Sequence, residues 1–216
     1  MSTSRDRVRQ ALSHQGSDRI PVDFGATAVT GIHCRVVEAL RKHYGLSYKP
    51  VKIVDTSQML GEVDRDLADA MGVDCIGVGG TRDIFDHDTE CMHEQVTPWG
   101  QKVLVPIQLD LTQDKEGDVY VYAGGDKNYP PSAIMPNGCF FINAIERQQP
   151  IDEDKLNPMD NLEEFNSITD EELDAYKKKV NEASATGRAV VASFGGTALG
   201  DVAFVPGMGL KEPKGI

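Results

Sequence analysis

The sequence has little cysteine, few aromatic residues and no long hydrophobic run. Four cysteines occur in 216 residues, and no two of them form a CxxC pair. This spacing favours reduced thiols over a disulfide framework and therefore predicts a cytoplasmic protein. No window approaches the roughly 20 apolar residues of a membrane-spanning helix, and the first residues contain no apolar signal region. We therefore expect neither export nor insertion into a membrane.

Basic residues are also scarce. The chain has 22 lysines and arginines against 34 aspartates and glutamates, which gives a formal net charge of -12. Nucleic acids and anionic membrane surfaces bind to positively charged surfaces, so we expect neither as a partner. The acidic residues lie mostly in charged, loop-like stretches, which favours a role in solubility over a role in cation binding. Hydrophobic residues make up 40% of the chain, enough to bury a core.

The first 80 residues alternate predicted helices with predicted strands. Pro21 fixes its own φ and keeps Ile20 out of the α region, so the apolar run that follows it is predicted to be a strand. A second short strand is predicted at 73–78. Apolar residues at helical spacing predict helices over 5–14, 33–45 and 57–71. This order is typical of an α/β protein with a parallel sheet covered by helices.

The middle of the chain departs from this alternation. Strand-like runs separated by turn-rich pieces predict antiparallel hairpins in a β-rich insert at about 94–145. These runs are at 102–105, 119–122 and 139–142. Residues 146–168 are predicted to be a long surface connection. A capping box at Thr169 and Glu172 then predicts a helix to about residue 185, followed by a buried strand at 189–194.

Three segments together resemble the uroporphyrinogen decarboxylase superfamily. They are RDRVRQAL with DRIPVDFG within 5–25, GVDCIGV at 72–78, and VVASFGGTALGD at 190–201. The similarity is greatest to the branch of corrinoid-dependent (methylcobalamin) methyltransferases. The resemblance implies a TIM (β/α)8 barrel, which takes about 250 residues. Because the insert occupies part of this chain, we expect one truncated domain over 1–216, the N-terminal part of a barrel.

The residues after the first predicted strand separate the branches of this superfamily. The resemblance implies that a decarboxylase would carry arginines there, whose guanidinium groups hold the carboxylates of a porphyrinogen. This chain has only small and hydroxyl residues between Gly25 and Gly31, and its first arginine after them is Arg35. Uroporphyrinogen decarboxylase activity is therefore the weaker alternative.

For the methyltransferase branch, the resemblance implies zinc as a cofactor and a corrinoid protein as a partner. The zinc would be held by a His-x-Cys pair and a later cysteine and would activate a thiol. These ligands come from later barrel strands, and we expect them beyond Ile216, so no metal ligand is assigned in this chain.

Two aspartates are candidate substrate-binding residues. Asp23 lies in the first predicted strand and Asp74 in the next. Burying a carboxylate without a partner is costly, so each should either reach a strand end or be paired. At the carboxyl ends of barrel strands such residues belong to the active site.

Two similar loops follow two of the predicted strands, Gly25-Ala26-Thr27-Ala28 and Gly195-Gly196-Thr197-Ala198. They would suit adjacent walls of one pocket, with Thr27, Gly195, Gly196 and Thr197 as candidate substrate-binding residues. The alternative interpretation is a pair of flexible loops. Neither loop has the GxGxxG spacing of a dinucleotide site.

The histidines offer further candidates. His33 begins the helix after the first strand and could contact a substrate, whereas the adjacent Cys34 is interpreted as a packing residue. His87, Cys91 and His93 are zinc-donor types that could meet in one loop. Their spacing matches no standard zinc signature, so a polar surface loop is favoured and no metal site is predicted.

The leading hypothesis is an enzyme that transfers a methyl group between a small methylated compound or thiol and a cobalamin. The alternative is a non-catalytic fragment or interaction module that needs a second chain. A partial barrel leaves strand edges open, so we also expect a homo-oligomer.

Overall fold

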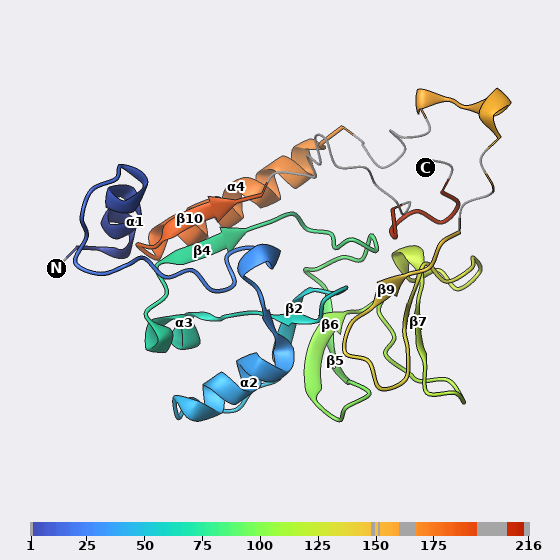
Figure 1. The fold of residues 1–216 in the computed structure, drawn as a ribbon, viewed down its shortest axis with the longest axis horizontal. Coiled ribbons are helices and arrows are strands. Elements are labelled where there is room, and N and C mark those ends of the chain that lie inside the picture. The colour runs from blue at the N-terminus through green and yellow to red at the C-terminus, as the bar shows by residue number, and fades with distance from the viewer. Residues whose placement is uncertain (1, 148–149, 151, 160–166, 194–206, 214–216) are drawn as a thin grey trace. The chain divides into compact units, whose positions relative to one another are not determined.

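The computed structural model describes residues 2–147, 150, 152–159, 167–193 and 207–213 (Figure 1). The chain is a mixed α/β protein whose described sheets are open. It divides into two compact units. Unit 1 comprises Met1–Lys52, Leu60–Thr81 and Thr169–Gly196, and unit 2 comprises Ile53–Met59, Arg82–Ile168 and Thr197–Ile216. None of the helices in the described ranges has the length and hydrophobicity that crossing a bilayer requires.

Two helices near the N-terminus form where the sequence predicts them. Helix α1 covers Ser4–Leu12, and the Thr3 side chain caps it by accepting a hydrogen bond from the Asp6 N–H group at 3.1 Å. Helix α2 covers Cys34–His43 and packs Cys34 and Val37 into the core of unit 1. The terminating residue Gly45 has a φ of +67°, as expected for a glycine that ends a helix.

The predicted helix over 57–71 is wrong in its first half. Helix α3 covers only Arg65–Met71 and begins at the cap Asp64. Before it, β3 (Leu60–Gly61) pairs antiparallel with β1 (Ile32–His33). A Cβ atom at Gly61 would come within 2.5 Å of the Val51 side chain. Close packing of strands therefore overrides the helical spacing of apolar residues here.

Unit 1 contains a parallel strand pair. Strands β4 (Cys75–Val78) and β10 (Ala189–Ala192) are paired in register from Cys75 opposite Ala189 to Val78 opposite Ala192. Helix α4 (Asp170–Ala185) precedes β10 and contacts both strands (Figure 1). Its predicted capping box is present, since the Thr169 N–H group donates to Glu172 and the Glu172 N–H group donates to Thr169. The predictions of β4 and α4 are confirmed. A strand also forms at Ala189–Ala192, but its residues are half-buried or exposed and not buried as predicted, and residue 194 lies outside the described residues.

The predicted strand after Pro21 does not form. The Asp74 N–H group donates to the Val22 carbonyl at 2.7 Å, but the Val22 N–H group donates to the Asp74 carboxylate at 2.9 Å. A side chain thus replaces the carbonyl that a regular ladder would use. Further along, a Cβ atom at Gly77 would come within 1.9 Å of the Ala26 carbonyl oxygen. Residues 22–26 therefore run beside 74–77 in the same direction.

Unit 2 contains the antiparallel strands of the expected insert. Strand β2 (Val51–Asp55) enters this unit at Ile53, and β6 (Lys102–Pro106) pairs antiparallel with β5 (Met92–Val96). A second sheet has the order β7 (Val119–Val121), β8 (Ala133–Met135) and β9 (Asn143–Ala144), again antiparallel. The prediction of antiparallel hairpins is confirmed.

One of the predicted strands in this region is wrong. Residues 139–142 lie between β8 and β9 and form turns, because the Cys139 N–H group donates to the Pro136 carbonyl and Gly138 has a φ of +78°. Short 3-10 helices at Ala28–Thr30 (η1), Ala123–Gly125 (η2) and Glu153–Lys155 (η3) complete the described elements. The last of these lies in the predicted surface connection, where the described residues are mostly exposed.

Candidate functional site at the carboxyl edge of the parallel segments

Residues 22–26, β4 and β10 run in the same direction, so their carboxyl ends meet at one edge of unit 1. In parallel α/β sheets, ligands bind at this edge because the loops there are free to vary while the strands hold them in place. The loop after residues 22–26 contains η1. It is closed by a 2.8 Å hydrogen bond from the Gly25 N–H group to the Thr30 carbonyl, and Gly25 takes a φ of +86° that favours glycine.

Asp23 lies in the segment that precedes this loop, one residue after Val22, and its side chain bonds to the loop. Its side chain is half-buried and accepts hydrogen bonds from the Ala26 N–H group at 3.3 Å and the Thr30 hydroxyl at 3.2 Å. Both distances are at the long end for such bonds. An ionised carboxylate has about four acceptor positions, so capacity remains for a further donor. None of the residues that the structure describes forms an ion pair with Asp23.

Threonines complete this loop. The Thr27 N–H group donates to the Thr30 hydroxyl oxygen at 3.4 Å, so the predicted Thr27 lies beside Thr30 and Asp23. Sequence reasoning missed Thr30. The signal that could have found it is a second hydroxyl residue in a loop bounded by Gly25 and Gly31.

Cys75 is a second residue that sequence reasoning missed. It lies on β4 and is half-buried. Burial raises the pKa of the Cys75 thiol, and the negative charges of Asp23 and Asp74 raise it further. The thiol therefore stays protonated at neutral pH and is a poor nucleophile.

Asp74 lies at the opposite, amino edge of β4 and is fully buried. Its carboxylate accepts from Arg7 at 2.5 Å, from Arg19 at 2.6 and 3.0 Å, and from the Val22 N–H group. Burial by itself would raise the pKa of this carboxyl, but these hydrogen bonds outweigh it, so the pKa is lowered. Asp74, predicted as a substrate-binding residue, therefore has the environment of a structural ion pair. Its oxygens are occupied by the protein itself.

The same cluster joins the segments that carry the resemblance. Arg7 belongs to RDRVRQAL, Asp18 and Arg19 to DRIPVDFG, and Asp74 to GVDCIGV. Arg7 also binds Asp18 through two bonds of 2.7 and 3.0 Å, which lowers the pKa of Asp18 to about 2. These segments are thus held together by charge at the amino edge.

The predicted His33 takes a capping position. It is the N-cap of α2, and its ring Nδ1 atom accepts from the Arg35 N–H group at 3.3 Å. The adjacent Cys34 is fully buried, and burial raises the pKa of its thiol to about 12. This agrees with the interpretation of Cys34 as a packing residue. Gly195, Gly196 and Thr197 lie outside the described residues.

The three candidate zinc donors do not share one site. His87 is fully buried with its Nε2 atom 3.1 Å from the Tyr122 carbonyl oxygen, Cys91 is exposed, and the His93 Nε2 atom lies 3.3 Å from the Leu109 carbonyl oxygen. Over the described ranges, no three histidine, cysteine, aspartate or glutamate side chains come together as metal ligands. His87, Cys91 and His93 therefore do not form one metal site.

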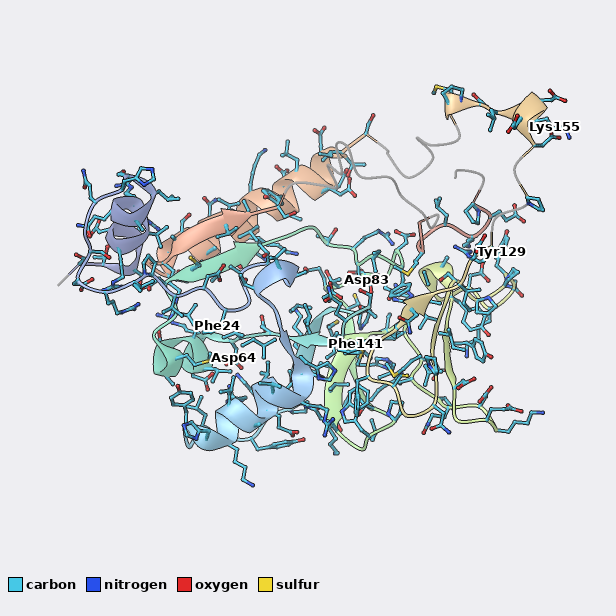
Figure 2. All side chains as sticks on the ribbon, viewed as in Figure 1. Phe24, Asp64, Asp83, Tyr129, Phe141 and Lys155 are labelled. Carbon is cyan, nitrogen blue, oxygen red and sulfur yellow. The ribbon has the colours of Figure 1, made fainter. Side chains whose placement is uncertain are left out.

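Asp83, labelled in Figure 2, forms a buried cluster in unit 2 that sequence reasoning also missed. It accepts hydrogen bonds from the Phe85 and His87 N–H groups at 2.9 Å each and from the Thr56 hydroxyl at 2.5 Å. The His87 Nδ1 atom lies 3.2 Å from an Asp83 oxygen. Burial opposes ionisation of Asp83, but its partners outweigh burial and lower its pKa. The cluster stabilises a tight loop in which Asp86 has a φ of +61°.

No family model, curated protein or solved structure matches this chain. The geometry of the carboxyl edge is therefore the basis for assigning a site. Hydrogen bonds link Asp23, Thr27 and Thr30 within residues 22–30, whereas Cys75 is the first residue of β4 and lies next to Asp74.

Proposed function

We propose that this chain is the N-terminal part of a (β/α)8 barrel of the uroporphyrinogen decarboxylase superfamily and functions with its corrinoid-dependent methyltransferases. The observation that carries this proposal is the order of three segments in unit 1: residues 22–26, β4 and β10, all running in the same direction. Consecutive strands of a barrel are parallel neighbours, and each follows a helix. Helix α4, which precedes β10 and packs on the β4–β10 pair, fits that pattern.

The ion cluster at the amino edge supports the superfamily assignment. Arg7, Arg19 and Asp74 come from the segments that suggested the family, and they meet within hydrogen-bond distance. In barrels the amino edge stabilises the fold while the carboxyl edge carries the chemistry. Arg7, Arg19 and Asp74 would then stabilise the barrel, and the loop that begins at Gly25 would contact the substrate.

The charge of this loop favours methyl transfer over decarboxylation of a porphyrinogen. No lysine or arginine occurs between Ile20 and Cys34, and the charged side chain that bonds to the loop is Asp23. A substrate with many carboxylates would meet a negative group here and lack a guanidinium partner. Decarboxylation of uroporphyrinogen therefore remains the weaker candidate.

In the proposed reaction, the chain's own residues orient a small substrate. Asp23 and the Thr30 hydroxyl would hold its polar group. A cobalamin, carried by a corrinoid protein, would supply or accept the methyl group when bound. Metal activation of a thiol is not proposed for the described residues, because His87, Cys91 and His93 lie apart in their contacts.

A second candidate function is an interaction module that works with another chain. Within the described residues, β10 pairs on one side with β4 and has no strand on its other side. An open strand edge can pair with another chain, including a second copy of this one. Light scattering on the purified chain would show a dimer or larger assembly, whereas a monomer with a cooperative melt would argue against this function.

The experiment for the proposed enzyme follows the visible absorbance of methylcobalamin incubated with the purified chain and a series of small thiols. We expect demethylation, and we expect Asp23→Asn to slow it about 10- to 100-fold, the worth of a hydrogen bond to a charged group. Asp174→Asn is the matched control, because Asp174 lies on α4 with 74% of its side chain exposed. This variant should keep the wild-type rate.

Three other outcomes would change the assignment. Turnover of uroporphyrinogen without demethylation of methylcobalamin would favour the decarboxylase. Activity that appears only after a second chain is added would favour the interaction module. Equal rates for Asp23→Asn and Asp174→Asn would remove Asp23 from the site.

A further inference from the structure

We infer that Asn137 is a site of covalent modification, at which the backbone nitrogen of Gly138 displaces the side-chain amide and leaves an aspartate or an isoaspartate. This modification does not depend on the proposed function. It follows from the turn after β8 in unit 2 and from the contacts of the Asn137 side chain.

Asn137 and Gly138 are the two central residues of an exposed turn. The Cys139 N–H group donates to the Pro136 carbonyl at 2.9 Å, and Gly138 has a φ of +78°, as the third residue of a type II turn requires. Both central residues are exposed, so water and hydroxide reach them. Among the residues that the structure describes, none accepts a hydrogen bond from the Gly138 N–H group. A base can therefore remove its proton without breaking a hydrogen bond to these residues.

The glycine that follows Asn137 favours the attack. Glycine has no Cβ atom, so its nitrogen can approach the preceding side chain with little steric hindrance. Every other asparagine of the chain is followed by a residue that has a side chain. Asn128 is the matched comparison, because it is also exposed and in unit 2 but is followed by Tyr129, whose N–H group donates to the Asp126 carbonyl at 3.3 Å.

The reaction consumes one water molecule and releases one ammonia. A bond forms between the Gly138 nitrogen and the side-chain carbonyl carbon of Asn137, and the bond from that carbon to Nδ2 breaks. The proton that leaves the Gly138 nitrogen passes through solvent to the departing nitrogen. Water then opens the cyclic imide at either of its carbonyls, which gives aspartate or isoaspartate and restores the Gly138 N–H group. Nothing is oxidised or reduced.

The Asn137 side chain connects this turn to the turn before β7. Its Nδ2 atom donates to the Glu116 carbonyl at 3.0 Å, and the Asn137 N–H group donates to the Asp118 carboxylate at 2.8 Å. The bond to Glu116 joins two neutral groups and breaks when Nδ2 departs, so the fold slows the reaction without preventing it. Either product replaces this donor with a carboxylate, which is repelled by the Glu116 carbonyl and by the negative charge of Asp118. The modification should therefore loosen the contact between the two turns.

The test is peptide mapping by mass spectrometry of the full chain after incubation at neutral and at mildly alkaline pH. We expect conversion at Asn137 to be at least about 10-fold faster than at Asn128, because the glycine nitrogen is less hindered. It should be faster at alkaline pH, because hydroxide removes the Gly138 proton. No conversion at Asn137, equal rates at the two asparagines, or a rate that does not rise with pH would overturn the inference.

Asn137→Gln tests the attack by Gly138. The glutamine side chain is one methylene longer, so the same attack would have to close a larger and less favoured ring, and we expect conversion at this position to be lost. Asn128→Gln is the matched control and should leave the rate at Asn137 unchanged. Conversion of Asn137→Gln at the wild-type rate would contradict the attack. Mapping of the wild-type chain keeps the inference testable if Asn137→Gln does not fold, as judged by circular dichroism.

Asn137→Asp reproduces one product and tests its effect on the fold. We expect a lower urea midpoint than for the wild type, because the donor to Glu116 is lost and a negative charge is added near Asp118. Asn181→Asp adds the same charge at an exposed position of α4 and should leave the midpoint unchanged. Equal midpoints for Asn137→Asp and the wild type would overturn the loosening of the two turns.

Discussion

Replacing Asp74 with asparagine tests whether the motif cluster stabilises unit 1. The substitution keeps the size of the side chain and an oxygen that can accept from the Val22 N–H group. It removes the charge that faces Arg7 and Arg19. Breaking a buried ion pair costs about 3 to 5 kcal/mol when the remaining partner stays buried.

The two arginines should share this cost unequally. The Arg7 side chain is 8% exposed but keeps its bonds to Asp18, whereas the Arg19 side chain is 42% exposed and can regain water. Both features reduce the penalty, so we expect Asp74→Asn to lower the free energy of unfolding by about 3 kcal/mol, the low end of the range. Urea unfolding followed by circular dichroism measures this difference.

A double-mutant cycle completes the experiment. The coupling free energy between Asp74 and Arg7 should exceed that between Asp74 and Arg19. The exposure of the Arg19 side chain limits the second value to about 1 kcal/mol. Asp174→Asn, at an exposed helix position, should change stability by less than about 0.5 kcal/mol. A loss below about 1 kcal/mol for Asp74→Asn, or the reverse order of the two couplings, would refute the role of this cluster in stability.

Two further predictions follow from unit 1. Arg7 lowers the pKa of Asp18 to about 2, and the pKa of Asp74 is lowered as well. The two ionised carboxylates therefore contribute fully to stability above the unfolded-state pKa near 4. This contribution is lost as the pH falls toward 2. Urea midpoints measured from pH 6 to pH 2 should therefore fall below about pH 4, and Asp18→Asn should flatten that fall; an unchanged profile would contradict the pairing. Gly77→Ala should cost about 1 to 3 kcal/mol, because its Cβ atom would come within 1.9 Å of the Ala26 oxygen, whereas Gly79→Ala, which meets nothing within 4 Å, should cost far less. Similar losses for both glycines in thermal melts would mean that residues 22–26 do not lie beside β4.

Local chemistry predicted the elements whose signals lie within a few residues. The capping box at Thr169 and Glu172 began α4, and Gly45 ended the region of α2, because caps and terminal glycines act through the backbone next to them. The hairpin strands β6 and β7 were likewise predictable from short apolar runs between turn residues. The spacing of apolar residues and the positions of turn residues were sufficient to predict these elements.

Other features depended on contacts between residues far apart in the sequence. Residues 57–64 have helical spacing, yet Leu60 and Gly61 form a strand that pairs with β1, and a Cβ atom at Gly61 would come within 2.5 Å of the Val51 side chain. Residues 20–24 have the composition of a strand, but the Asp74 carboxylate takes the Val22 N–H group that a regular ladder would use. In both places a partner distant in sequence decided the local conformation.

Asp23 and Asp74 show the same difference between what local sequence predicts and what distant contacts decide. The sequence by itself determined the α/β class, the helix ends and the presence of a carboxylate at positions 23 and 74, because these follow from residue type and local spacing. Only the tertiary structure decided that Asp74 is neutralised by Arg7 and Arg19 while Asp23, among the described residues, accepts from neutral donors. Ion pairing depends on which charges the fold brings within a few ångströms, and residues separated by more than 50 positions, such as Arg19 and Asp74, meet only after the chain has folded.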